Sequence, residues 1–214
     1  MFFVELFVSK GALEPEQRRR VARRLGRLGE LSDGEPAEGA DEVSEMAPRS
    51  AAVAAAMFQV VVHEPEIWVA AENLVTPEGP PRCVVRVHVP GPWRKDLSET
   101  LVAYATRIIA AEFEDRLRPY REPTVQVHVI GVSEGSIGLR GKVATSNDIV
   151  EMLSEPYRED AAEGRALRDP MCGVLVPLEG NTATVELDGE LYAFCCAGCR
   201  AEFLAKRRKA AARE

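Results

Sequence analysis

The feature that most restricts the fold of this chain is a cluster of cysteines near its C-terminus. The 214-residue sequence holds five cysteines, and four of them lie in its last fifth: Cys172, Cys195, Cys196 and Cys199. The segment that carries them, residues 169–205, has only 37 residues. So short a segment rarely builds a sufficient hydrophobic core of its own. The sequence therefore predicts a small domain that is stabilised by cross-links through its thiols.

The start of the chain helps to decide whether a metal ion or disulfide bonds link these thiols. Met-Phe-Phe-Val-Glu-Leu-Phe has no basic region before its apolar residues, so we expect no secretory signal and a cytoplasmic location. Thiols stay reduced there, which favours a metal site over a disulfide framework. Transient thiol exchange and buried, metal-free cysteines remain alternatives. The fifth cysteine, Cys83, stands in an apolar run and is predicted to be a small buried hydrophobic residue.

The spacing of the cysteines predicts how they meet. Cys172 and Cys195 are separated by 22 residues, which include two strand-like segments at 182–187 and 190–194. The Asp188-Gly189 pair between these segments is a strong signal for a two-residue hairpin turn. Such a hairpin would bring Cys172 close to the cysteines that follow the second strand.

Cys195 and Cys199 have three residues between them. In a helix they would lie one turn apart on the same face, so their sulfurs could share one ion. A helix N-terminus also lowers the pKa of a thiol and so favours the metal-binding thiolate.

A family resemblance rests on these same residues. Asp169-Pro170-Met171-Cys172-Gly173, the spacer, Tyr192-x-Phe194-Cys195-x-x-x-Cys199 and the trailing Phe203 resemble the YHS domain, part of the TRASH-like group of small metal-binding modules. The resemblance implies a treble-clef-like or zinc-ribbon-like fold. It also implies that Cys172, Cys195 and Cys199 are metal ligands. Cys196 falls where the family varies and is an optional fourth ligand. Val174 stands where the family usually has a methionine, which removes a potential thioether ligand.

The number of ligands bears on the metal. A closed structural zinc site has four ligands, and thiolate is a good one. Three thiolates instead suit Cu(I) or Hg(II) in a trigonal site. The choice depends on Cys196. We expect zinc first, with copper or mercury as alternatives.

The first 153 residues show a repeated pattern of strand, helix and strand. Strands are predicted at 2–8, 58–63, 83–89 and 125–130, long helices at 14–28 and 97–117, and short helices at 49–56 and 147–153. Two tandem β-α-β units of this kind can form one four-stranded sheet with both long helices on one face. The fold class is therefore α+β. The other face of the sheet would need cover, and self-association is the simplest source of it.

This plan, with Phe3-Val4-Glu5-Leu6-Phe7, Lys10-Gly11-Ala12-Leu13 and Glu16-Gln17-Arg18, resembles the tautomerase superfamily of 4-oxalocrotonate tautomerase and MIF-like proteins. The resemblance implies a trimer and an amino-terminal proline that acts as the base. Here Phe2 takes the place of that proline, and it is too large for ordinary removal of the initiator methionine. We therefore expect a scaffold without tautomerase activity and assign no catalytic residue. The three histidines are predicted to be structural strand residues: His63, His88 and His128.

The organisation that follows has four parts. These are a tautomerase-like domain at 1–153, a linker at 154–168, the YHS-like domain at 169–205 and a basic tail at 206–214. The net charge of −7 argues against a broad nucleic-acid surface, which needs a positive field. No apolar run is long enough to span a membrane.

Two functions are open. The first is a metal-binding protein that displays its thiolate site on an oligomeric, trimeric scaffold. The second is a divergent isomerase or hydrolase of small unsaturated acids, with the zinc module purely structural. Arginines of the 14–28 helix would then bind the substrate carboxylate.

Overall fold

The computed structural model describes residues 2–26, 47–180 and 182–211. The predicted end of the first helix, Leu28, lies outside this range. The described residues form two compact units. The first contains residues 2–26 and 57–145, and the second contains residues 47–56 and 146–211.

The first unit is built on a four-stranded sheet with the order β2-β1-β5-β6. The strands are β1 (Phe2–Val8), β2 (Phe58–His63), β5 (Cys83–Pro90) and β6 (Val125–Val132). β1 is parallel to β2, β5 is parallel to β6, and β1 joins the two pairs by running antiparallel to β5. The predicted pair of β-α-β units in one sheet is therefore confirmed.

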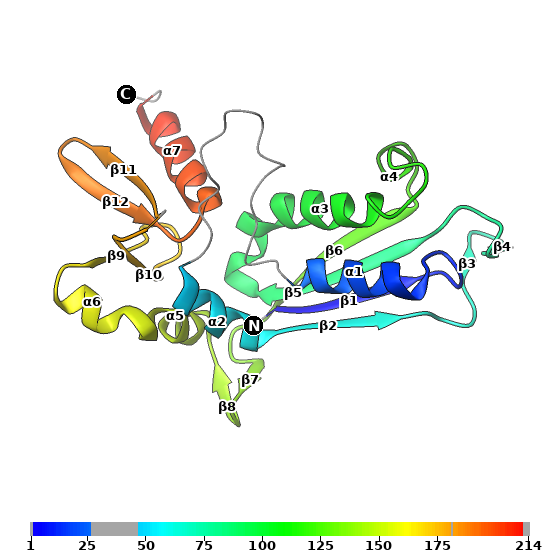
Figure 1. The fold of residues 1–214 in the computed structure, drawn as a ribbon, viewed down its shortest axis with the longest axis horizontal. Helices are drawn as coiled ribbons and strands as arrows, with labels where there is room; N and C mark the ends of the chain where they lie inside the picture. The colour runs from blue at the N-terminus through cyan, green and yellow to red at the C-terminus, as the bar shows by residue number, and fades with distance from the viewer. Residues whose placement is uncertain (1, 27–46, 181, 212–214) are drawn as a thin grey trace. The chain divides into compact units, whose positions relative to one another are not determined.

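One face of this sheet is covered by α1 (Pro15–Leu25) and α3 (Arg94–Ala110), as Figure 1 shows. Side chains alternate along a strand, and in β1 every second residue is fully buried: Val4, Leu6 and Val8. β5 repeats the pattern with Val85, Val87 and Val89. From above, α1 contributes Val21 and Leu25, and α3 contributes Leu101, Ala105, Ile108 and Ile109.

The opposite face of the sheet is half-buried or exposed. Phe3, Glu5 and Phe7 point to it from β1. Glu5 lies between two histidines, with its carboxylate 3.6 Å from His63 Nε2 and 3.2 Å from His88 Nε2. This face, which we call the open face, carries both polar and apolar side chains.

α3 begins and ends earlier than the predicted helix at 97–117. A 3-10 turn at Gly91–Trp93 leads directly into α3, so the helix begins three residues before the predicted start at residue 97. At the other end, the N–H of Phe113 donates to the carbonyl of Ala110 at 3.2 Å. This tighter i−3 bond replaces the helical one and ends α3.

Shorter elements complete the first unit. They are α4 (Arg118–Arg121), the hairpin of β3 (Val69–Ala70) with β4 (Asn73–Leu74), and the hairpin of β7 (Ile137–Leu139) with β8 (Lys142–Ala144).

The second unit combines short helices with two hairpins. Its helices are α2 (Pro48–Met57), α5 (Ser146–Ser154), α6 (Arg158–Ala162) and α7 (Ala197–Ala211). Its strands are β9 (Ala166–Arg168), β10 (Leu175–Pro177), β11 (Ala183–Leu187) and β12 (Glu190–Phe194). None of the helices in the described part of the chain is long and apolar enough to cross a membrane.

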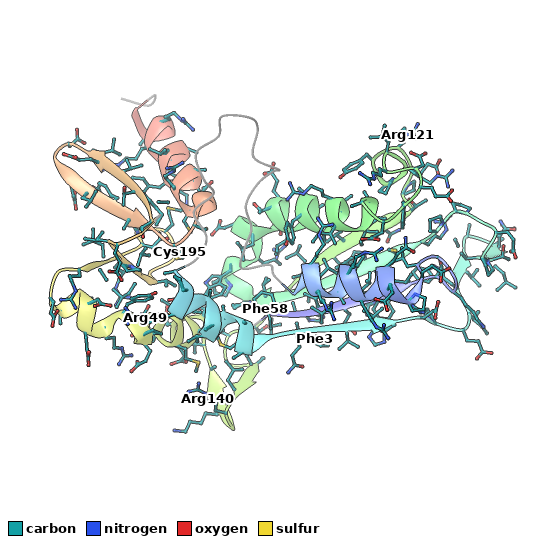
Figure 2. All side chains as sticks on the ribbon, in the orientation of Figure 1. Phe3, Arg49, Phe58, Arg121, Arg140 and Cys195 are labelled. Atoms are coloured by element: carbon teal, nitrogen blue, oxygen red, sulfur yellow. The ribbon has the colours of Figure 1, made fainter. Side chains whose placement is uncertain are left out.

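Residues 154–168, for which the sequence predicts a linker, carry regular structure. They hold a 3-10 turn, α6 and β9, and Tyr157 and Ala166 are buried among them. α2 packs here too: Ser50 Oγ donates to the Leu153 carbonyl at 2.6 Å, and Arg49 (Figure 2) donates to Asp160 at 2.6 Å. Elements of three to five residues are too short to show a periodic pattern.

Candidate metal centre

The first half of the site is the loop between β9 and β10. These strands pair antiparallel, and the chain between them turns tightly. The N–H of Asp169 donates to the Val174 carbonyl at 2.9 Å, and the N–H of Gly173 donates to the Asp169 carbonyl at 2.8 Å. Gly173 has a φ of +80°, a conformation that glycine adopts without steric cost. The turn places Cys172 at its tip.

The second half follows the hairpin of β11 and β12. Asp188 and Gly189 both have positive φ, 55° and 78°, as a two-residue turn of type I′ requires. The turn predicted from Asp188-Gly189 is therefore confirmed. Cys195 comes directly after β12 (Figure 2), and α7 begins two residues later.

Aromatic packing holds α7 against this hairpin. Phe194, the last residue of β12, is fully buried. The ring of Phe203 on α7 lies 5.2 Å from the ring of Phe194 and 4.9 Å from that of Tyr192. Edge-on and tilted pairs at such distances are favourable. Phe203 is one turn beyond Cys199, so this contact fixes the first turns of α7 beside the Cys172 loop.

The two halves bring three predicted cysteines together. Cys172 Sγ lies 3.4 Å from Cys195 Sγ, which lies 3.6 Å from Cys199 Sγ. These sulfurs and a carboxylate oxygen of Asp169 all lie within 4.8 Å of one another. We call these four residues the Cys/Asp cluster.

The two other cysteines are not in the Cys/Asp cluster. Cys196 stands just before α7, and its sulfur accepts the N–H of Cys199 at 3.5 Å, as a helix-capping side chain does. Cys83 lies in β5 and is 1% exposed, and burial raises the pKa of its thiol to about 12. The prediction that Cys83 is a small buried hydrophobic residue is confirmed.

Asp169 is the member of the cluster that sequence reasoning missed. Its side chain is buried, and burial, followed by the negative charge of Cys172, raises the pKa of its carboxyl above the ordinary value. The sequence signals only its local hydrogen bond, since an aspartate at such a turn commonly accepts the backbone N–H two residues ahead.

The pKa values of the three thiols in the Cys/Asp cluster depend on one another. Hydrogen bonds from the thiols of Cys195 and Cys199 lower the pKa of Cys172. The same contacts with the Cys172 sulfur raise the pKa of Cys195 and of Cys199. A single negative charge in the cluster is therefore stabilised by hydrogen bonds between the thiols. Three converging sulfur donors fit zinc, Cu(I) or Hg(II), the ions that thiolate sites prefer.

Comparison with known proteins agrees with this geometry in the C-terminal part. Residues 166–212 match the sequence model of a family described as the C-terminal TRASH domain. This match confirms the resemblance to the TRASH-like group. No curated protein matches the chain.

Solved structures also resemble part of the chain. Pt0534 inactivated by 2-oxo-3-pentynoate has a TM-score of 0.47 at 15% identity, over 68% of this chain and 98% of its own. Native fused 4-OT has a TM-score of 0.48 at 14% identity, over 66% and 95%. The macrophage migration inhibitory factor-like protein of Entamoeba histolytica has a TM-score of 0.43 at 7% identity, over 67% and 98%.

Residues 166–212 thus match the C-terminal TRASH domain family, by whose name we call them below, and the chain joins this TRASH domain to a larger α+β domain built on a four-stranded sheet.

Proposed function

We propose that the TRASH domain binds one metal ion through the thiolates of Cys172, Cys195 and Cys199. The observation that carries the proposal is the convergence of three sulfurs from two distant segments, within 4.8 Å of one another. Thiols gathered without a cation would have to keep their protons or repel one another as thiolates. A bound ion removes that conflict and supplies the folding free energy that a small domain lacks.

Zinc is the metal we propose first, with copper or mercury as alternatives. Three thiolates are enough for Cu(I) or Hg(II), whereas zinc takes a fourth ligand. Cys196 is the proposed optional fourth ligand. To serve as one it would have to leave its hydrogen bond with the N–H of Cys199. We also propose a cytoplasmic location, because the thiols must stay reduced to bind metal.

The test is metal analysis of protein purified without added metal. Wild-type protein should hold about one equivalent per chain, and Cys195→Ser should lose it, because one ligand is removed from the shared ion. Cys83→Ala is the matched control: it also removes a thiol, but one buried in the sheet unit, and it should keep the metal. Equal metal in wild type and Cys195→Ser would reject the proposal.

The larger domain is proposed to be a trimeric scaffold that is not catalytic. Its open face presents Phe3, Phe7 and Val61, the last 38% exposed, and burial of apolar surface between copies would stabilise them. Light scattering should give a mass three times that of the chain. A monomeric mass would contradict this part of the proposal.

A second candidate function is a divergent tautomerase-superfamily isomerase or hydrolase. It is favoured by a hollow of about 350 Å³ lined by Pro15, Arg18, Arg19, Ala22 and Val62, since arginine suits a carboxylate substrate. Against it, Arg18 is already paired with Glu64 and Arg19 with Glu16.

The two functions can be separated by one assay. Turnover of small unsaturated acids by the full chain should survive Cys195→Ser and be lost in Arg18→Ala if the enzyme function is correct. No turnover by wild-type protein would reject it.

A further inference from the structure

Asp169 is the one carboxylate among the thiols of the Cys/Asp cluster, and its role differs from theirs. We infer that Asp169 is a positioning residue that clamps the two halves of the site through backbone N–H groups and is not itself a metal ligand. The inference rests on the proposed function, because it assigns the part that this residue plays when the thiolates bind metal.

Both carboxylate oxygens of Asp169 are already engaged. Oδ1 accepts the N–H of Met171 at 2.7 Å and that of Cys172 at 3.4 Å. Oδ2 accepts the N–H of Cys195 at 2.8 Å. One carboxylate thus binds the main chain of both halves of the site, at the very residues that carry two of the sulfurs.

These bonds oppose ligation by Asp169. The side chain is 1% exposed, so water cannot take over an N–H that the carboxylate releases. Turning an oxygen toward a metal ion would leave the N–H of Cys195 or of Met171 buried without its partner, which costs free energy.

The clamp also explains why a carboxylate stands here. Its two oxygens can both accept, and the structure uses one for each half. An asparagine at 169 could accept at one end only, because its amide nitrogen would face a donor N–H in one of the two halves. Charge-assisted bonds from backbone N–H groups are also stronger than neutral ones, which offsets the burial of the carboxylate beside sulfur.

The test compares Asp169→Asn with wild type in the full chain, using zinc as the probe. The variant should bind zinc about tenfold to a hundredfold more weakly, the loss typical of a residue that orients ligands. In zinc-saturated protein the amide of Cys195 or of Met171, whichever faces the amide nitrogen, should exchange faster in the variant. Asp188→Asn is the matched control. It removes the same charge in the same domain at an exposed turn, where asparagine tolerates the positive φ, and both measurements should stay at wild-type values.

A measurement on wild-type protein alone guards against failure of the variant to fold. If Asp169 is a clamp, the Cys195 amide is protected from exchange in the zinc-bound protein. A zinc-bound protein that is folded but leaves this amide unprotected would overturn the inference, because it would mean that the carboxylate has turned to the metal. Wild-type protein that binds no zinc would reject the proposed function together with the dependence of the domain on an ion, and protection of the Cys195 amide in that protein would still decide the clamp.

Discussion

At the scale of single residues, the backbone of Gly173 controls where Cys172 lies. Gly173→Ala should lower the free energy of unfolding of the TRASH domain by about 1 kcal/mol, because a non-glycine residue is strained at positive φ. The added Cβ would meet Val150 Cγ1 at 3.5 Å, an ordinary contact, so the loss belongs to the backbone. Urea denaturation measures it.

Gly138→Ala serves as the control for this substitution. Gly138 lies in β7 without positive φ, and the nearest atom to an added Cβ is 4.0 Å away. It should leave its own unit at least as stable as before. An equal loss at both glycines would show that the φ of Gly173 is not the cause.

The residue scale also shows what the sequence could predict of the site. The spacing of Cys172, Cys195 and Cys199 predicted their convergence, because one hairpin turn was enough to place them. Asp169 could not be assigned in the same way. Its partner, the N–H of Cys195, lies 26 residues away and is a backbone group, which leaves no mark in the sequence.

At the scale of elements, an ion pair links α1 to the residues that follow α3. Arg20 Nη2 lies 2.7 Å from Glu112, whose side chain is 10% exposed. The hydrogen bond from Arg20 lowers the pKa of Glu112 below its ordinary value of 4.5. A carboxyl whose pKa is lower in the folded state stabilises the fold above its unfolded pKa. That stabilisation is lost as the pH falls through the folded pKa.

Glu112→Gln should therefore be less stable than wild type near neutral pH. The difference should shrink as the pH falls below about 4.5, because wild-type Glu112 is then protonated too. Urea midpoints of the sheet unit across this pH range measure the effect. Glu114→Gln, at an exposed position two residues on, is the control and should change little. A difference that persists in acid would contradict the ion pair as its cause.

The elements differ in how well the sequence predicted them. The four strands of the sheet were predicted within two residues, because alternating or continuous apolar runs mark them clearly. The ends of α3 were not, since a 3-10 turn at Gly91–Trp93 leads into a helix that begins three residues before the predicted start. The segment at 154–168 was also missed, because Tyr157 and Ala166 are buried by contacts with Leu175 that only the tertiary fold supplies.

At the scale of the whole molecule, the two units obtain their stability from different sources. The sheet unit has fully buried side chains on both β1 and β5, which is enough for a hydrophobic core. The TRASH domain is expected to depend on its ion. A chelator should therefore raise amide exchange across residues 166–211 and leave β1 and β5 unchanged. Exchange by mass spectrometry measures both regions in one sample.

Cys195→Ser provides the matched comparison for the chelator. It should raise exchange in the same residues without any chelator, because it removes the same ion. A chelator effect that also reaches β1 and β5, or that is absent from residues 166–211, would show that metal does not hold the small domain together.

The most direct test of the account is the set of atoms around the bound metal in the full chain. X-ray absorption at the edge of the metal that the protein retains on purification should show a first shell dominated by sulfur. About three sulfur atoms are expected, from Cys172, Cys195 and Cys199, or about four if Cys196 joins them. A first shell of nitrogen and oxygen alone would contradict the thiolate centre.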